Sequence, residues 1–148
     1  MKTIGTANGI GIAIPDDASL SFHNSPYIGH RNQSSVDIYP AHEDWSGSAF
    51  SPVDGKVVRT QQIKMGKPRR FKTEEFDHAI GIQPIDNEES IVRILHCRPT
   101  IQTGDTISMG EEIGSLLRSR YFNFWTSPHY HVEVLNSQDF RRSSNSYV

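Results

Sequence analysis

Hydrophobic and polar residues alternate in short runs along this chain, and Gly, Pro, Asn and Asp separate the runs. Alternation over roughly four to eight residues is typical of β-strands with one buried face. The runs that alternate, or that are apolar and rich in β-branched residues, are 10–15, 35–40, 55–63, 78–85, 90–97, 113–117 and 129–135. The pattern predicts an all-β fold, an antiparallel β-sandwich or flattened barrel with little helix.

The length of 148 residues is enough for one domain with a substantial core, so residues 1–148 are predicted to form a single domain. Within it, Asp54-Gly55 stands between two apolar stretches. An Asp-Gly pair in this setting is a strong signal for a tight β-hairpin turn. We therefore expect a strand, a turn and a second strand around these two residues.

Charge and composition exclude several classes of protein. The formal net charge is −2, so there is no electrostatic basis for nucleic-acid or membrane partners. The single cysteine, Cys97, excludes an internal disulfide. No signal-peptide-like segment is seen, and no apolar run approaches the ~20 residues of a membrane span. As it stands the sequence predicts a cytoplasmic protein; removal of a signal peptide would make it extracytoplasmic. It does not indicate an oligomeric state.

The strongest local chemical signal is the pair of histidines in "SPHYHVEV", residues 127–134. His129 and His131 are two positions apart in a stretch with strand character, so their side chains should project from the same face of a sheet. Two imidazoles held side by side in this way favour a metal site or a site of proton transfer.

Further candidate ligands lie in "YIGHRNQSSVDIYP", which carries His30 and Asp37. A hydrolytic zinc site uses three protein ligands with nitrogen or oxygen donors and keeps one position for water. His30, Asp37 and one member of the 129/131 pair would supply such a set. One imidazole of the pair would then serve as a ligand and the other in acid–base chemistry.

Another histidine, His96, ends the apolar run "SIVRILHC". Its neighbour Cys97 should point to the opposite face of the strand, so Cys97 is not expected to be a ligand. We interpret Cys97 as a small buried apolar residue.

The order of these motifs resembles the M23 family of zinc metallopeptidases, of the lysostaphin and LytM type. The segments that carry the resemblance are the His30 and Asp37 region, "SPVDGKVV", "ILH", "GDTISMGEEIG" and "SPHYHVEV", which together span about residues 29–134. The most specific of them are "PHYHVEV" and "GDTISMGEEIG". The resemblance implies the fold of that family, the duplicated hybrid motif.

The resemblance also implies a role for each matching residue. His30, Asp37 and His131 match the family's zinc ligands, and His96 and His129 match its catalytic histidines. The implied cofactor is Zn2+, and the implied reaction is hydrolysis of peptide bonds in cell-wall-type or glycine-rich peptides. The partner would therefore be a peptide or peptidoglycan-like substrate.

The chain departs from the family pattern at one ligand. The family usually has three residues between its first His and its Asp, whereas six residues separate His30 from Asp37 here. The chain between the two must bulge if both side chains are to reach one ion. This departure supports an alternative, a catalytically inactive zinc-binding protein of the same fold with a binding or regulatory role.

Two other resemblances stay open. The segments "PVDGKVV", "HAIGI" and "IVRILH" are similar to glucose-type IIA phosphocarrier domains, in which His78 and His96 would form the phosphorylated pair. The segment "IKMGK" is similar to the lysine-bearing turn of biotinyl carrier domains, with Lys64 as acceptor. The phosphocarrier resemblance gives no role to His30, to Asp37 or to the 129/131 pair.

Overall fold

We describe the protein from a computed structural model, and the description covers residues 1–4, 10–21, 35–41, 47–66, 76–118 and 127–136. Within these ranges every regular element is a β-strand. The strands are β1 (Lys2–Ile4), β2 (Ile12–Ile14), β3 (Ser19–Ser21), β4 (Ser35–Tyr39), β5 (Ser48–Phe50), β6 (Gly55–Lys64), β7 (Phe76–Pro84), β8 (Ser90–Leu95), β9 (Cys97–Pro99), β10 (Thr106–Ile107), β11 (Glu112–Leu116) and β12 (Tyr130–Asn136).

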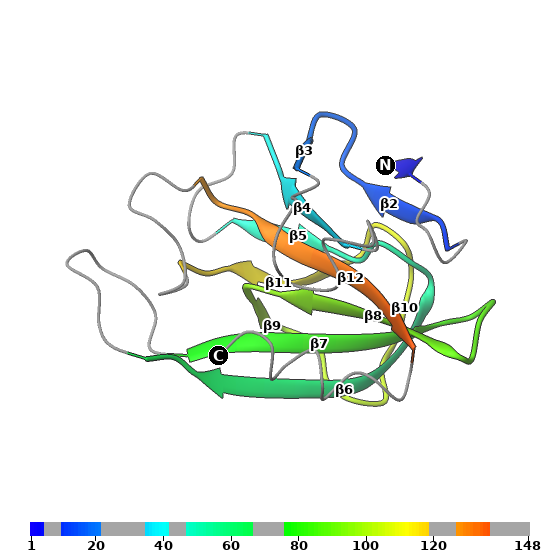
Figure 1. Ribbon diagram of the computed structural model, residues 1–148. Coiled ribbons are helices and arrows are strands. Elements are labelled where there is room, and N and C mark those ends of the chain that lie inside the picture. Colours follow the sequence, from blue (N-terminus) through cyan, green and yellow to red (C-terminus); the bar gives the residue numbers. More distant parts are fainter. Residues whose placement is uncertain (5–9, 22–34, 42–46, 67–75, 119–126, 137–148) are drawn as a thin grey trace.

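The strands form three antiparallel sheets (Figure 1). The largest has seven strands in the order β10-β6-β7-β8-β12-β4-β3, the second has the order β5-β11-β9, and β1 pairs with β2. None of the described segments is a helix long and apolar enough to cross a membrane. The prediction of an all-β antiparallel sandwich is confirmed, and the sheets do not close into a barrel.

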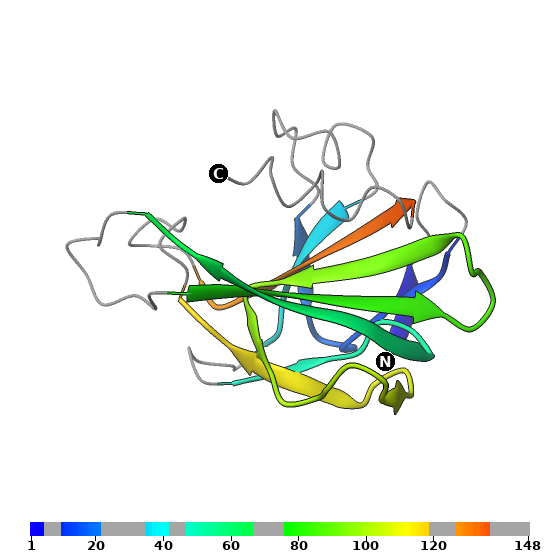
Figure 2. The same cartoon turned by 90° about the horizontal axis from the view of Figure 1, so that it is seen from below.

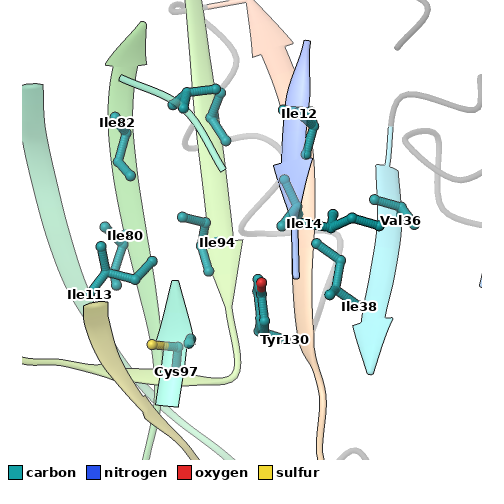
Figure 3. Close-up of a cluster of buried hydrophobic side chains, with 14 of the residues drawn as sticks. Ile12, Ile14, Val36, Ile38, Ile80, Ile82, Ile94, Cys97, Ile113 and Tyr130 are labelled. Carbon is teal, nitrogen blue, oxygen red and sulfur yellow. The ribbon is translucent and has the colours of Figure 1, made fainter. Parts of the chain in front are cut away.

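The apolar core lies between the seven-stranded sheet and the three-stranded sheet, which pack face to face (Figure 2). Alternate residues of the central strands point into it, because successive side chains of a strand project to opposite faces. Figure 3 shows part of this cluster, including Ile80 and Ile82 of β7, Ile94 of β8 and Ile113 of β11. The expectation from the hydrophobic alternation is therefore met at the residues that define the core.

The intervening residues of the same strands point to the other face of the seven-stranded sheet. On β8 and β12 these residues include Arg93, His131 and Glu133, and on β4 they include Asp37. All four are buried although they are charged or polar. The sheet thus has one apolar face for the core and one face that carries a buried polar cluster.

A single residue connects the two packed sheets at one corner. Strand β8 of the large sheet ends at Leu95 and β9 of the small sheet begins at Cys97, so the chain changes sheets at His96. Its φ angle is 67°, in the left-handed region that residues other than glycine rarely adopt. This backbone turn sends Cys97 into the apolar core, as expected from the sequence.

The prediction of a β-hairpin at Asp54-Gly55 is wrong. Strands β5 and β6 flank these residues, but β5 belongs to the three-stranded sheet and β6 to the seven-stranded sheet. Oδ1 of Asp54 accepts a hydrogen bond from the backbone N–H of Met109 (2.7 Å), which ties the turn to the β10–β11 connection. A Cβ on Gly55 would lie 2.4 Å from the carbonyl oxygen of Gln83. Glycine is needed here for close strand pairing and not for a hairpin turn.

Candidate functional site

Asp37 and His131 are at the centre of the buried polar cluster. Their backbones are directly paired across β4 and β12, so their side chains project together from one face of the sheet. Oδ1 of Asp37 lies 2.6 Å from Nδ1 of His131. Burial alone would raise the pKa of Asp37, but the hydrogen bond and the charge of His131 outweigh it and hold that pKa well below its usual range. Asp37 is therefore an ionised carboxylate aimed at one imidazole nitrogen.

The other nitrogen of His131 is held by Glu133, two residues further along β12. Nε2 of His131 lies 2.7 Å from Oε1 of Glu133, and Nη2 of Arg93 donates to Oε2 of Glu133 at 2.6 Å. Burial alone would lower the pKa of His131, but the hydrogen bonds to Asp37 and Glu133 outweigh it and raise the pKa to about 9. Glu133, fixed by Arg93, therefore orients the ring so that Nδ1 faces Asp37.

His129 lies beside this pair and is held differently. Its Nδ1 is 3.0 Å from the carbonyl oxygen of Ser127, which only accepts hydrogen bonds, so Nδ1 carries the proton and Nε2 the lone pair. The ring lies against Tyr39, with 4.7 Å between ring centroids. Burial, together with the charge of His96, lowers the pKa of His129 to about 4. His129 is thus neutral at neutral pH and its Nε2 can accept a proton.

His96 completes the group of imidazoles. Its ring centroid lies 5.6 Å from that of His129 and 6.3 Å from that of His131. Nδ1 of His96 is 2.6 Å from Oδ2 of Asp77, a buried residue of β7. Burial alone would raise the pKa of Asp77, but the charge of His96 and the hydrogen bonds from His96 and His78 outweigh it and lower that pKa. Asp77 is therefore ionised and can only accept hydrogen bonds.

The charges of this cluster leave a deficit of positive charge. The buried charged residues of the described chain are three carboxylates and one guanidinium; they are Asp37, Asp77, Glu133 and Arg93. Three carboxylates and one guanidinium leave two excess negative charges out of water, and the protonated ring of His131 compensates one of them at neutral pH. An imidazole nitrogen and a carboxylate oxygen facing each other are donors that zinc accepts. The donor set therefore fits a divalent cation.

The structure brings together four of the five residues that the sequence singled out for chemistry: Asp37, His96, His129 and His131. The fifth, His30, lies outside the described residues. Within the described ranges, no three His, Cys, Asp or Glu side chains have the arrangement of a metal site. The assignment of His30, Asp37 and His131 as ligands and of His96 and His129 as catalytic stays a prediction.

Sequence reasoning missed three members of the cluster: Asp77, Arg93 and Glu133. Arg93 had a recognisable signal, since it is one cation inside the apolar run "SIVRIL" and a buried arginine needs a buried anion. Glu133 had a weaker signal, because it shares the strand face of His131 two residues away. Asp77 had none, since its only distinction is its position opposite His96 in the folded sheet.

Several solved structures resemble the fold, among them the following two. The catalytic domain of the prophage-encoded M23 protein EnpA from Enterococcus faecalis, in a mutant form, matches with a TM-score of 0.57 and 16% identity over 85% of this chain and 86% of that chain. The solution structure of lysostaphin matches with a TM-score of 0.51 and 17% identity over 82% of this chain, which spans only 45% of the lysostaphin chain. The fold is therefore that of M23 domains.

A family model also assigns the chain to a family. Residues 12–148 match the family described as "Domain of unknown function (DUF8155) N-terminal domain", and the chain belongs to that family. No curated protein matches the sequence.

Proposed function

We propose that this chain is a zinc-dependent, M23-like metallopeptidase that hydrolyses peptide bonds. The observation that carries the proposal is the 2.6 Å contact between Oδ1 of Asp37 and Nδ1 of His131, inside a buried cluster that holds three carboxylates and one guanidinium. A divalent cation held by these two donors in place of the proton that they share would leave no excess negative charge in the cluster. The likeness of the fold to M23 domains supports the same proposal.

In this proposal Asp37 and His131 hold the ion together with His30. Nδ1 is the ligating nitrogen of His131, because Nε2 is engaged by Glu133. A carboxylate behind a ligating histidine fixes its ring and increases its basicity. Zinc bound there supplies a Lewis acid and lowers the pKa of a bound water towards ~7.

His129 and His96 move protons in the proposed reaction. Each has Nδ1 facing an oxygen acceptor, the carbonyl of Ser127 or the carboxylate of Asp77, so each has its lone pair on Nε2 when neutral. His129 accepts the proton of the attacking water through Nε2 and returns it to the leaving amine. His96 orients the water and the scissile carbonyl from the neighbouring position.

The proposed substrates are cell-wall-type or glycine-rich peptides, as the family resemblance implies. The direct test measures the zinc content of the purified protein and screens such peptides for cleavage. We expect one zinc per chain, lost in Asp37→Ala and in His131→Ala. We expect His129→Ala to keep its zinc and to lose hydrolysis by about 10²–10⁴-fold.

His78→Ala is the matched control, because it removes a half-buried imidazole that strand alternation directs away from the face of Asp77. It should keep both zinc and activity. Phosphate transfer to His96 of the wild type that is lost in His78→Ala would support the phosphocarrier alternative and contradict the proposal. Zinc binding without cleavage of any peptide would favour the inactive zinc-binding alternative.

A further inference from the structure

Asp77 makes an unusually complete set of contacts with His96. Its Oδ2 lies 2.6 Å from Nδ1 of His96, and its Oδ1 accepts the backbone N–H of His96 at 3.0 Å. The same Oδ1 accepts the backbone N–H of His78 at 2.7 Å. The carboxylate is 2% exposed, so these three donors satisfy it in place of water. One carboxylate thus forms hydrogen bonds with both the ring and the main chain of His96.

The main chain of His96 needs such support. Among the described residues it is the one non-glycine residue with a positive φ, 67°. A side chain with a Cβ is strained in this region, and such strain persists only where the surroundings enforce it. The contacts with Asp77 supply this constraint at the corner between β8 and β9. The strained conformation directs the ring towards His129 and His131, at centroid distances of 5.6 and 6.3 Å.

We propose that Asp77 is a positioning residue that keeps His96 in its left-handed conformation with the proton on Nδ1 and the lone pair on Nε2. Asp77 acts through His96 alone and does not contact substrate. The catalytic consequence rests on the proposed peptidase function, whereas the tautomer of His96 is a property of the protein itself. Nε2 of His96 is then an acceptor for a proton or for a hydrogen bond from water within the cluster.

The geometry predicts an unusual effect of Asp77→Asn. Two backbone N–H groups converge on the Oδ1 position, so the amide oxygen of the asparagine must take that position. Its NH2 group must then face Nδ1 of His96. An NH2 group only donates, so His96 has to accept through Nδ1 and carry its proton on Nε2. An isosteric change therefore inverts the tautomer of the histidine.

Nitrogen NMR of 15N-histidine-labelled protein at alkaline pH tests this directly, with His96 assigned by comparison with His96→Gln. We expect the Nδ1–H tautomer in the wild type and the Nε2–H tautomer in Asp77→Asn. Asp86→Asn, the same change at an exposed site at the other end of β7, should leave the wild-type tautomer. A wild-type His96 protonated on Nε2 overturns the proposal, even if Asp77→Asn fails to fold. An unchanged tautomer in folded Asp77→Asn also overturns it.

Kinetics and metal content separate this inference from the proposed function. If the wild type cleaves a peptide, Asp77→Asn should lose about 10³–10⁴-fold in kcat with little change in KM, as happens when a carboxylate-to-amide change imposes the wrong tautomer on a catalytic histidine. Its zinc content should equal that of the wild type. If the wild type cleaves nothing, the peptidase proposal fails, while the inverted tautomer would still support the positioning role. Full activity in Asp77→Asn with an inverted tautomer would contradict the catalytic consequence.

Discussion

Arg93 and Glu133 face each other on β8 and β12 and form an ion pair of 2.6 Å with 0% and 4% of their side chains exposed. Removal of one partner of such a pair leaves an uncompensated buried charge and costs about 3–5 kcal/mol. We expect Arg93→Met to lower the free energy of unfolding by this amount in urea titrations. The double variant Arg93→Met/Glu133→Gln should recover most of the loss, because it buries no unpaired charge.

Lys56→Met is the control for the variants of the Arg93–Glu133 pair, since it removes an exposed cation from β6. Its free energy of unfolding should change by no more than about 0.5 kcal/mol. Equal losses in Arg93→Met and in the double variant would show that the pair is not coupled, contrary to the geometry.

Asp77 should contribute to stability in a pH-dependent way. Its pKa in the folded protein is below the ordinary value because the charge of His96 and three hydrogen bonds outweigh burial. The unfolded chain therefore takes up a proton at higher pH than the folded protein does. The stabilisation is fully present above the unfolded pKa of about 4 and is lost as the pH falls through the folded value.

Urea unfolding of metal-free protein at a series of pH values measures this effect. The difference in unfolding free energy between wild type and Asp77→Asn should be largest near neutral pH and should narrow below about pH 4. Asp86→Asn, at an exposed position, should follow the wild-type curve. A difference between wild type and Asp77→Asn that stays constant with pH would contradict the assigned contacts.

Cys97 should resist thiol reagents as long as the protein is folded. Burial raises the pKa of its thiol, and the charges of Asp77 and Glu112 raise it further. The side chain is also fully buried in the apolar core. Because the thiolate is the reactive species, we expect alkylation only through global unfolding. Mass spectrometry after timed exposure to iodoacetamide checks this, and modification that is rapid in native buffer would disprove it.

Gly114 should not tolerate a side chain. It lies on β11, where a Cβ would be 2.2 Å from the carbonyl oxygen of Arg98 and 2.5 Å from Sγ of Cys97. Gly114→Ala must push β9 and β11 apart, and we expect a cost of about 1–3 kcal/mol in thermal unfolding. Gly66→Ala is the matched control, because no atom of the described residues lies within 4 Å of its Cβ position. Equal melting temperatures of the two variants would contradict the close packing of these strands.

Much of the fold could be predicted because the strands that build the core have strong alternation. Each of the seven runs singled out in the sequence overlaps a strand of the structure, from β2 to β12. The strands that were missed are β1, β3, β5, β9 and β10, which have two or three residues each. Such short strands pair because their neighbours are already in place, so no local pattern marks them. The turn at Asp54-Gly55 was misinterpreted for a similar reason, since sheet membership is decided by distant partners.

The candidate site was predictable where a motif carries it and not where the fold creates it. Asp37 and His131 are 94 positions apart. Metal-ligand chemistry grouped Asp37 with one histidine of the 129/131 pair, and the resemblance to a family motif selected His131. Arg93 and Glu133 are 40 positions apart, and their contact follows from strand order, which sequence spacing does not reveal. The position of His30 lies outside the described residues, so its part in the site stays a prediction.

The single-residue corner at His96 has a consequence for how this domain can be altered. The backbone conformation of His96 sets both the position of one sheet relative to the other and the direction of the His96 ring. An added or deleted residue there would therefore disturb the packing of the sheets and the geometry of the site together. The turn between β7 and β8 lies at the end of β8 opposite to His96 and connects two strands of the same sheet. Peptide tags and grafted loops belong at that turn, and length variation among natural relatives should collect there while the corner keeps its length.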